Sequence, residues 1–255
     1  MLKRDMVSSR EQARRLIKSG AVLVDGQPAQ KPGAMITERQ VIDILQHEKY
    51  VGRGGQKLER ALDKFGIDVS RLTACDIGAG TGGFCHCLLE RGAAKIYAVD
   101  VGHSQLDRRI SDHSRVVNLE GVNFRHQTDA IPTGLDFACV DVSFISLDKI
   151  LPNLYNILKP SANAVCLIKP QFEAGRDKLN KHGLVTDPRV HTQALELVAE
   201  YISKAGFSLL GLCHSPIKGG SGNIEYLAHI RKDDNLTNFD GDIKSIVAKA
   251  HVELK

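Results

Sequence analysis

Residues 76–84 read Asp76-Ile77-Gly78-Ala79-Gly80-Thr81-Gly82-Gly83-Phe84 and form a glycine-rich turn after an apolar run. The run from Leu72 to Ile77 predicts a strand, and the turn predicts the start of a helix. Glycines at such a turn let the backbone approach a bound ligand closely. The spacing satisfies the pattern GxGxxG, which taken alone is a weak signal.

Apolar strand candidates alternate with helical segments from this turn to the end of the chain. Seven strands are expected, at residues 72–77, 95–100, 115–119, 137–142, 164–168, 207–213 and 226–230. The alternation predicts an α/β fold of Rossmann-like type, with a seven-stranded, mostly parallel sheet between helices. Residues 240–255 are expected to form an amphipathic helix that packs on the core.

Two classes of cofactor bind to loops of this kind. A dinucleotide places its pyrophosphate there, whereas S-adenosylmethionine carries an ammonium, a carboxylate and a sulfonium. Asp76 would repel a pyrophosphate and attract the positive groups of S-adenosylmethionine, so we favour a methyltransferase over a dehydrogenase. The expected cofactor residues are Asp76, Gly78, Ala79, Gly80, Thr81, Gly83, Phe84, Asp100, Val101, Asn123 and Asp141. Asp100 would accept from the ribose hydroxyls, and Asn123 would lie near the adenine or serve only as a turn residue.

The first sixty residues carry most of the positive charge. They hold 12 Lys/Arg against 7 Asp/Glu, a balance of +5, whereas the rest holds 22 against 23, a balance of −1, giving +4 for the chain. A basic segment beside a near-neutral body suggests a polyanion-binding appendage, and a solvated surface is the alternative.

This basic segment has the pattern of a small α+β unit. Ser9-Arg10-Glu11-Gln12 fits a capping box that starts a helix, and Gly20 is placed to end it. Asp25-Gly26 predicts a hairpin turn, and residues 41–45 predict a further strand. The cationic residues expected to contact RNA phosphates are Arg10, Arg14, Arg15 and Lys18 on the helix and Arg53 beyond it.

The same unit resembles the αL (S-four-type) RNA-binding domain shared by a ribosomal small-subunit protein, certain pseudouridine synthases and tyrosyl-tRNA synthetases. Residues 9–13 and 22–26 carry this resemblance. It implies an RNA-binding domain at residues 1–48. The glycines near Arg53 indicate a linker at 49–56, which leaves residues 57–255 for a catalytic domain.

Four segments outside the glycine-rich turn carry a denser signal. They are Gly54-Gly55-Gln56-Lys57-Leu58, Val140-Asp141-Val142-Ser143-Phe144-Ile145-Ser146, Ile168-Lys169-Pro170-Gln171-Phe172-Glu173 and Gly222-Asn223-Ile224-Glu225-Tyr226-Leu227. With them the chain up to about Arg231 closely resembles the TlyA family, once labelled hemolysins and also described as ribosomal-RNA 2′-O-methyltransferases. The resemblance implies a class I methyltransferase fold, S-adenosylmethionine as cofactor, ribosomal RNA or ribosomal subunits as partner, and a cytidine as target.

The resemblance also implies a catalytic tetrad. In the wider FtsJ-like class a Lys-Asp-Lys-Glu tetrad does the chemistry, and the motif matches carry it onto Lys57, Asp141, Lys169 and Glu225. A ribose hydroxyl is a poor nucleophile, so a positioned base is needed; Lys169 is expected to be that base, with Lys57 nearby favouring its neutral form. The two acids would orient the lysines. Gly80 is a departure, since relatives often have Ser there.

Three aromatic residues, Phe144, Phe172 and Tyr226, flank the tetrad motifs. They are expected either to stack on the target base or to pack the core beneath the site. The six cysteines form no CxxC pair, so no metal is expected.

The chain has neither a signal-like N-terminal stretch nor a run of eighteen apolar residues, which predicts a cytoplasmic protein with no membrane partner. This argues against a membrane-active hemolysin. The complete tetrad argues against a catalytically silent RNA-binding or ribosome-assembly factor.

Overall fold

The computed structural model describes residues 1–255 except residues 5, 8–9, 46–48, 127–128 and 238 and the side chain of residue 11. The chain divides into two compact units, Met1–Val51 and Gly52–Lys255. Each unit buries its own cluster of apolar side chains, so each is described by itself.

The N-terminal unit combines one helix with a small antiparallel sheet. Its elements are η1 Leu2–Arg4, α1 Arg10–Lys18, β1 Val22–Val24, β2 Gln27–Pro28 and β3 Ile42–Ile44, with strand order β2-β1-β3. Asp25 and Gly26 have φ angles of 51° and 77°, as the tight hairpin between β1 and β2 requires. Leu16 of α1 packs on the sheet. The expected helix cap, Ser9, lies outside the described residues.

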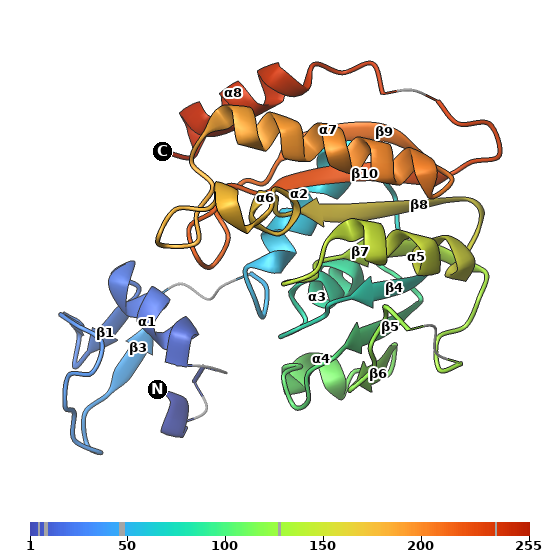
Figure 1. Cartoon of the computed structure of the whole chain (residues 1–255). Helices are drawn as coiled ribbons and strands as arrows, with labels where there is room; N and C mark the ends of the chain where they lie inside the picture. Colours follow the sequence, from blue (N-terminus) through green and yellow to red (C-terminus); the bar gives the residue numbers. More distant parts are fainter. Residues whose placement is uncertain (5, 8–9, 46–48, 127–128, 238) are drawn as a thin grey trace. The chain divides into compact units, whose positions relative to one another are not determined.

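The larger unit is built on a seven-stranded sheet (Figure 1). The strands are β4 Thr73–Ile77, β5 Lys95–Asp100, β6 Val116–Glu120, β7 Leu135–Val140, β8 Leu158–Ile168, β9 Phe207–His214 and β10 Tyr226–Lys232. Their order is β6-β5-β4-β7-β8-β10-β9, and β10 runs antiparallel to both of its neighbours. The mostly parallel sheet confirms the predicted α/β fold.

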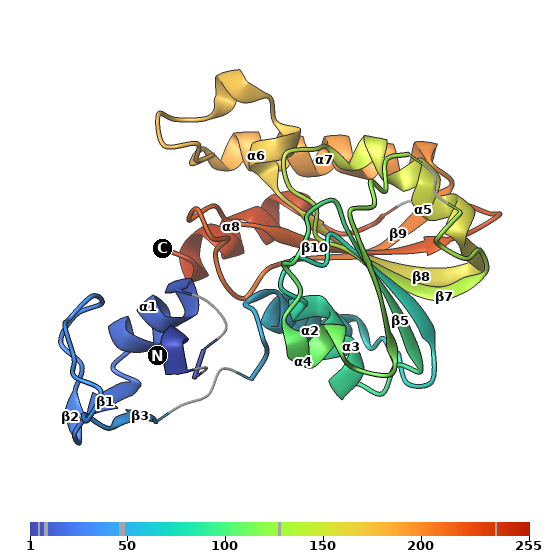
Figure 2. The ribbon, with the colours of Figure 1, turned by 90° about the horizontal axis from the view of Figure 1, so that it is seen from below.

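Helices cover both faces of this sheet (Figure 2). One face carries α2 Gly54–Phe65, α3 Gly83–Glu90 and α4 Arg108–Ser111, and the other carries α5 Leu151–Ile157, α6 Pro170–Glu173 and α7 Pro188–Lys204. Two short 3-10 turns accompany these helices: η2 Leu147–Lys149 lies directly before α5, and η3 Arg176–Lys178 lies between α6 and α7 in sequence. The last helix, α8 Ile243–Glu253, packs on α7 and β9 and buries Val247 and Ala250, as its amphipathic pattern predicts.

The order of the strands determines where a ligand can bind. From β4 the sheet continues to β5 on one side and to β7 on the other, so the chain changes direction across the sheet at β4. Ligands of open parallel sheets bind outside the carboxyl ends of the strands at such a reversal. β4, β5, β7 and β8 end there in Ile77, Asp100, Val140 and Ile168. The fold therefore brings motifs that are far apart in sequence to one edge.

Candidate active site

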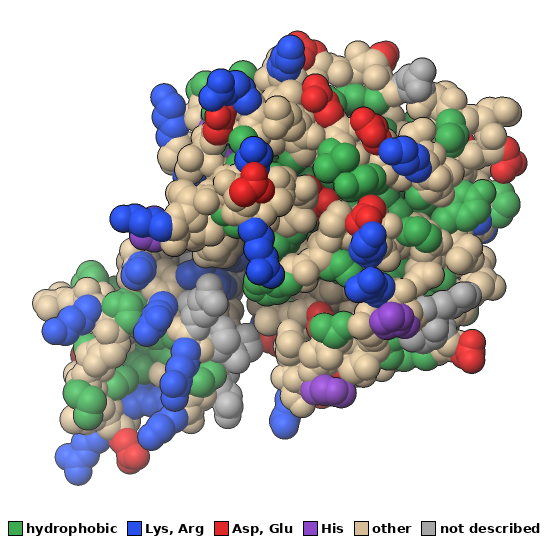
Figure 3. Space-filling view, in the orientation of Figure 1, with side chains coloured by type: hydrophobic (Ala, Val, Ile, Leu, Met, Phe, Trp, Pro, Cys, Tyr) green, Lys and Arg blue, Asp and Glu red, His purple; other side chains and the backbone are tan. Residues whose placement is uncertain are grey.

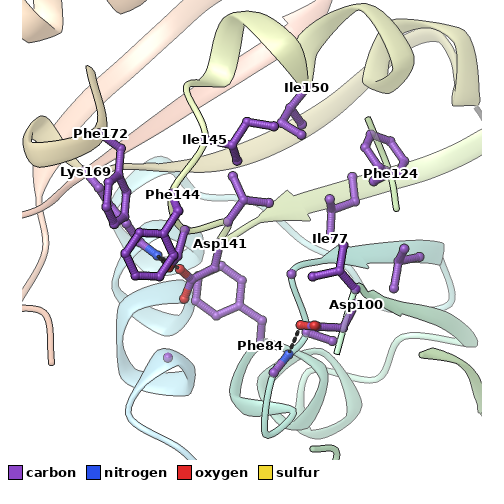
Figure 4. A pocket seen from close by; sticks show the side chains of 18 of the residues that line it. Ile77, Phe84, Asp100, Phe124, Asp141, Phe144, Ile145, Ile150, Lys169 and Phe172 are labelled. Atoms are coloured by element: carbon purple, nitrogen blue, oxygen red, sulfur yellow. Dashed lines mark hydrogen bonds and ion pairs between the residues drawn. The ribbon is translucent and has the colours of Figure 1, made fainter. Parts of the chain in front are cut away.

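A cavity of about 770 Å³ opens at this edge of the sheet (Figure 4). Its volume is in the range usual for small-molecule and cofactor sites. The lining comes from the glycine loop, the ends of β5, β7 and β8, the first turn of α2 and the loop before β10. All four residues of the expected tetrad line it: Lys57, Asp141, Lys169 and Glu225.

Lys169 and Asp141 form the first of two ion pairs in the cavity. Each is the first residue after its strand, and β7 and β8 are parallel neighbours, so the two side chains meet at the sheet edge. Lys169 Nζ lies 2.6 Å from Asp141 Oδ1 and donates to Ser143 Oγ at 2.9 Å. The lysine side chain is only 9% exposed. Two partners therefore fix the direction in which this amine points.

Lys57 and Glu225 form the second ion pair. Lys57 lies in the first turn of α2 and Glu225 directly before β10, and Nζ and Oε2 are 2.5 Å apart. Both side chains are almost fully buried, at 8% and 4% exposure. A buried lysine of this kind needs a partner, because leaving its charge unpaired in the interior is costly. The sequence did not predict which acid belongs to which lysine.

Arg53 also contacts the segment before β10 within the larger unit. Its guanidinium donates to the backbone carbonyl of Lys218, in the loop that leads to Glu225. Arg53 lies four residues before Lys57, so both side chains join the start of α2 to the segment before β10. This contact was not expected, because Arg53 was assigned to RNA phosphates from its charge alone.

The glycine loop lies against the backbone of neighbouring segments. Gly78, Gly80 and Gly82 have φ angles of 84°, 51° and 88°, which side chains disfavour. A Cβ on Gly78 would collide with the carbonyl of Asp141, and one on Gly83 would press on the backbone of residues 52–55. Gly78 and Gly83 are therefore required by close packing of the loop against the residues after β7 and the start of α2.

Asp100 ties the glycine loop to the end of β5 (Figure 4). Its Oδ2 accepts from the N–H of Gly80 at 2.8 Å and its Oδ1 from the N–H of Gly102 at 2.7 Å. Each carboxylate oxygen can accept a second hydrogen bond, so the side chain can still receive a hydroxyl. The cofactor candidates that line the cavity are Gly78, Ala79, Gly80, Thr81, Gly83, Phe84, Asp100, Val101, Asn123 and Asp141.

Several lining residues were not assigned from the sequence. They are Gln105, Phe124, Arg125, Ser143, Gln171 and Ser221. Ser143 and Gln171 stand inside the quoted motifs, where a polar residue beside a tetrad member was the available signal. Asn123 Oδ1 accepts from the N–H of Arg125 at 3.1 Å, so Asn123 lines the cavity and also stabilises a turn.

Asp76 is the one cofactor candidate that lies away from the cavity lining, which corrects the role given to it. Its side chain is fully buried beneath the glycine loop. Oδ2 accepts from the N–H of Cys85 at 2.9 Å, and Cys139 Sγ lies 3.6 Å from Oδ1. Burial raises the pKa of this carboxyl from an ordinary value of 3.8 to about 7. Asp76 therefore anchors the first turn of α3 instead of facing a ligand.

Replacing Asp76 with asparagine should flatten the pH dependence of stability. Because folding raises the pKa to about 7, the folded chain keeps a proton that the unfolded chain loses, and the wild-type free energy of unfolding falls from about pH 4 to pH 7. The variant should gain on the wild type by roughly 1.4 kcal/mol per pH unit in this window. Urea denaturation at pH 5 and pH 8 measures the difference, and parallel profiles would contradict the shift.

The three aromatic candidates separate into two groups. Phe144 is 91% exposed, and its ring centroid lies 5.0 Å from that of Phe172 beside the Lys169 amine (Figure 4). Tyr226 is completely buried and its hydroxyl is hydrogen-bonded to His191 Nδ1 at 2.8 Å. Tyr226 thus packs the core, and the phenylalanine pair forms an apolar rim at the cavity.

Three of the four cations expected to contact RNA from helix α1 are exposed. Arg10, Arg14 and Lys18 are exposed, and Arg15 is half-buried. Arg10 and Arg14 line a groove of about 390 Å³ together with Lys31. Basic side chains are prominent on the visible face of this unit, where few acidic ones are seen (Figure 3).

Among the described residues, no helix combines the length and the apolar character needed to span a bilayer. Within the same ranges, His, Cys, Asp and Glu side chains form no group of three or more that could hold a metal ion. All six cysteines are buried free thiols.

Comparison with known proteins gives matches over both units. Residues 50–232 match the FtsJ-like methyltransferase family, and residues 2–42 match the S4 domain. The 16S/23S rRNA (cytidine-2′-O)-methyltransferase TlyA of Mycobacterium tuberculosis is 38% identical over 234 residues, which cover 91% of this chain and 87% of that protein. Hemolysin A of Brachyspira hyodysenteriae is 42% identical over 226 residues, covering 87% and 93%.

A solved structure from Streptococcus thermophilus, which bears the name hemolysin, has a TM-score of 0.83 with this chain at 42% identity. The match covers 98% of this chain and 93% of that one. The chain is therefore similar, over most of its length, to proteins that carry two different functional names.

Proposed function

Because the chain belongs to the FtsJ-like methyltransferase family, we propose that it transfers a methyl group from S-adenosylmethionine to a ribose 2′-hydroxyl of ribosomal RNA. TlyA relatives have this reaction in their names, with cytidine as the methylated nucleoside, and we propose cytidine for this chain as well. The observation that carries the proposal is the convergence of two buried lysine–carboxylate pairs on a cavity lined by the glycine loop.

The cavity lining is compatible with S-adenosylmethionine. Asp100 ends β5 with lone pairs left for ribose hydroxyls, and Val101, Val122 and Ile150 offer apolar surface to a purine ring. The loop from Gly78 onward carries no basic side chain for a pyrophosphate, and the acids in the lining suit an ammonium group. When bound, this cofactor would supply a methyl group activated by a positively charged sulfur.

The chain's own residues would accept the proton of the 2′-hydroxyl and align the ribose with the methyl group. Lys169, with its amine in the neutral form, would take the proton of the 2′-hydroxyl and become an ammonium as the oxygen becomes a nucleophile. Asp141 and Ser143 hold its amine in place through the contacts of 2.6 and 2.9 Å. The buried pair of Lys57 and Glu225 forms another wall of the cavity and would fix the position of the ribose. Holding the reacting atoms in line can supply much of the acceleration.

The exposed Phe144 ring would stack on the target base, with Phe172 behind it. Bases of single-stranded RNA are commonly recognised by stacking on aromatic side chains. The nearly full exposure of Phe144 at the edge of the cavity supports this role, because its apolar ring faces water until a ligand covers it.

We propose a division of labour between the two parts of the chain. Residues 1–48 would bind RNA phosphates through Arg10, Arg14, Arg15 and Lys18. The expected linker 49–56 shortens to residues 49–51, because the larger unit begins at Gly52 and α2 at Gly54, and this larger unit would carry out the transfer. The S4 match and the exposed cations on α1 support the first role. Ribosomal RNA or ribosomal subunits would be the partner, which implies work in the cytoplasm.

The test is methyl transfer from labelled S-adenosylmethionine to purified, unmodified small and large ribosomal subunits. We expect label in RNA, and mapping of the product should place it on a ribose 2′-oxygen of a cytidine. Cofactor binding without transfer to either subunit would contradict the ribosomal substrate. Failure to bind S-adenosylmethionine would contradict the methyltransferase itself.

A membrane-active hemolysin is the second candidate, favoured by the names of two relatives. Leakage of dye from liposomes at low protein concentration, without cofactor, would support it. We expect no leakage under conditions in which transfer to RNA is complete.

A further inference from the structure

We propose that Glu173 is a positioning residue whose carboxylate ties loop 141–146 to helix α6, and so holds Phe144 and Lys169 in register for the target nucleotide. The inference rests on the proposed function for its catalytic consequence, but its structural part can be tested without any substrate. Glu173 occurs in the same motif as Lys169, yet the tetrad chemistry gives it no role.

Glu173 joins two elements that each carry part of the site. Its Oε2 accepts from Ser146 Oγ at 2.5 Å, and its Oε1 accepts from the N–H of Leu147 at 3.0 Å. Leu147 begins η2, and an N–H at the start of a helical turn has no partner within the turn. The carboxylate supplies that partner from α6. We call the three residues, Glu173, Ser146 and Leu147, the clasp.

Loop 141–146 is fixed at both of its ends. The ion pair of Asp141 with Lys169 holds its first residue, and the clasp holds its last. Lys169 is the residue directly before α6, and Glu173 is the last residue of this single helical turn. Between these two connections the rings of Phe144 and Phe172 meet. Loop and helix are therefore joined at both ends and in the middle.

Phe144 needs such support because its backbone is in an unfavourable conformation. Its φ angle is 63°, in the left-handed region that residues other than glycine seldom adopt. The side chain is 91% exposed, so burial does not hold the residue in place. Strained residues persist only where the surrounding structure fixes them, and the clasp is two residues away.

The surroundings of Glu173 disfavour a negative charge, and the two hydrogen bonds of the clasp offset part of this effect. Burial raises its pKa above the ordinary value, and the nearby charge of Asp148 raises it further, while the two hydrogen bonds of the clasp lower it. A carboxyl that only needed to be neutral could be replaced by an apolar side chain. The paired acceptors explain why an acid stands here.

Glutamine and alanine separate the clasp from a general need for an acid. Glu173→Gln can remake the clasp, because its carbonyl oxygen can accept from Leu147 and its amide can donate to Ser146. Glu173→Ala removes both bonds. Glu196→Ala, at an exposed position on α7, is the matched control. We expect kcat for RNA to fall by about 10- to 100-fold in Glu173→Ala, and by less than about fivefold in Glu173→Gln.

The cofactor affinity is the second readout, because the glycine loop and Asp100 lie outside the clasp. It should stay within about twofold of wild type in all three variants. If Glu173→Ala does not fold, Ser146→Ala removes one bond of the clasp and should give a smaller loss of kcat of the same kind. Unchanged kcat in folded Glu173→Ala, or in Ser146→Ala where Glu173→Ala does not fold, would overturn the proposal. A loss of cofactor affinity equal to the loss of kcat would overturn it too.

A substrate-free measurement keeps the clasp distinct from the proposed function. The chain has eight phenylalanines, so fluorine NMR of fluorophenylalanine-labelled protein should be resolvable, with the Phe144 signal assigned through Phe144→Leu. We expect this signal to shift and narrow in Glu173→Ala but not in Glu173→Gln. If wild type methylates no RNA while the signal moves as expected, the function fails and the clasp stands. A Phe144 signal unchanged in Glu173→Ala would overturn the clasp.

Discussion

Replacement of Lys169 by methionine should lower the rate of methyl transfer by roughly 10²- to 10⁴-fold, the contribution usual for a positioned base. The amine is held at 2.6 Å from Asp141 and 2.9 Å from Ser143, so it presents one fixed direction to the cavity. Methionine keeps the length of the side chain and removes the amine. The measurement is single-turnover transfer to ribosomal subunits at saturating cofactor, with cofactor affinity determined separately.

Lys169→Arg is the control that separates a base from a positive charge. Arginine can keep the ion pair with Asp141 but does not release its proton at ordinary pH. We expect Lys169→Arg to lose rate to the same extent as Lys169→Met, and both to bind S-adenosylmethionine within about threefold of wild type, since the glycine loop is untouched. Substantial activity in Lys169→Arg would show that residue 169 orients the substrate and that another group removes the proton.

The sheet could be predicted from sequence where a strand is mostly apolar. Strands β4, β5 and β7 are mostly apolar, with few polar residues among their five or six, and their observed bounds lie close to the expected ones. β8 starts at Leu158, six residues before its expected start at Ala164. Residues 159–161 are Lys, Pro and Ser, which give no apolar signal, and the pairing with β7 changes register in this region. Such a start is determined by the neighbouring strand.

The motifs predicted which residues gather at the cavity, but not their pairing or direction. Parallel strands β7 and β8 bring Asp141 to Lys169, and that adjacency is a property of the sheet order. Asp76 was expected to face the cofactor because it precedes the first glycine. Its side chain instead meets the backbone N–H of Cys85 in α3, a direction that the motif does not encode.

Charge alone did not predict the hydrogen bond that Arg53 makes within the larger unit. Arg53 was grouped with the RNA-binding residues, yet its guanidinium bonds the carbonyl of Lys218 within the catalytic unit. Ser143 and Glu173 were passed over because a serine and a glutamate inside a motif have many uses. Their roles depend on distances of 2.5 to 3.0 Å across loops that a sequence does not place.

Glu225→Ala should have the largest effect on stability, with a loss of about 3–5 kcal/mol in the free energy of unfolding. The variant leaves the ammonium of Lys57 in a site where its side chain is 8% exposed, with its ion-pair partner gone. Glu200→Ala is the matched control, because Glu200 pairs with Lys204 at the surface, with side chains 63% and 73% exposed. Exposed pairs of this kind contribute at most about 1 kcal/mol.

The double variant Lys57→Met with Glu225→Leu shows what the buried pair is for. Apolar side chains of similar volume can replace a buried ion pair with little loss, or a gain of about 1–4 kcal/mol, because neither charge has to leave water. We therefore expect the double variant to have wild-type stability or above when it is measured by urea denaturation, while methyl transfer is lost. A double variant as unstable as Glu225→Ala would mean that the pair is needed for folding. Recovery of stability without activity would mean that the chain keeps this ion pair for its chemistry.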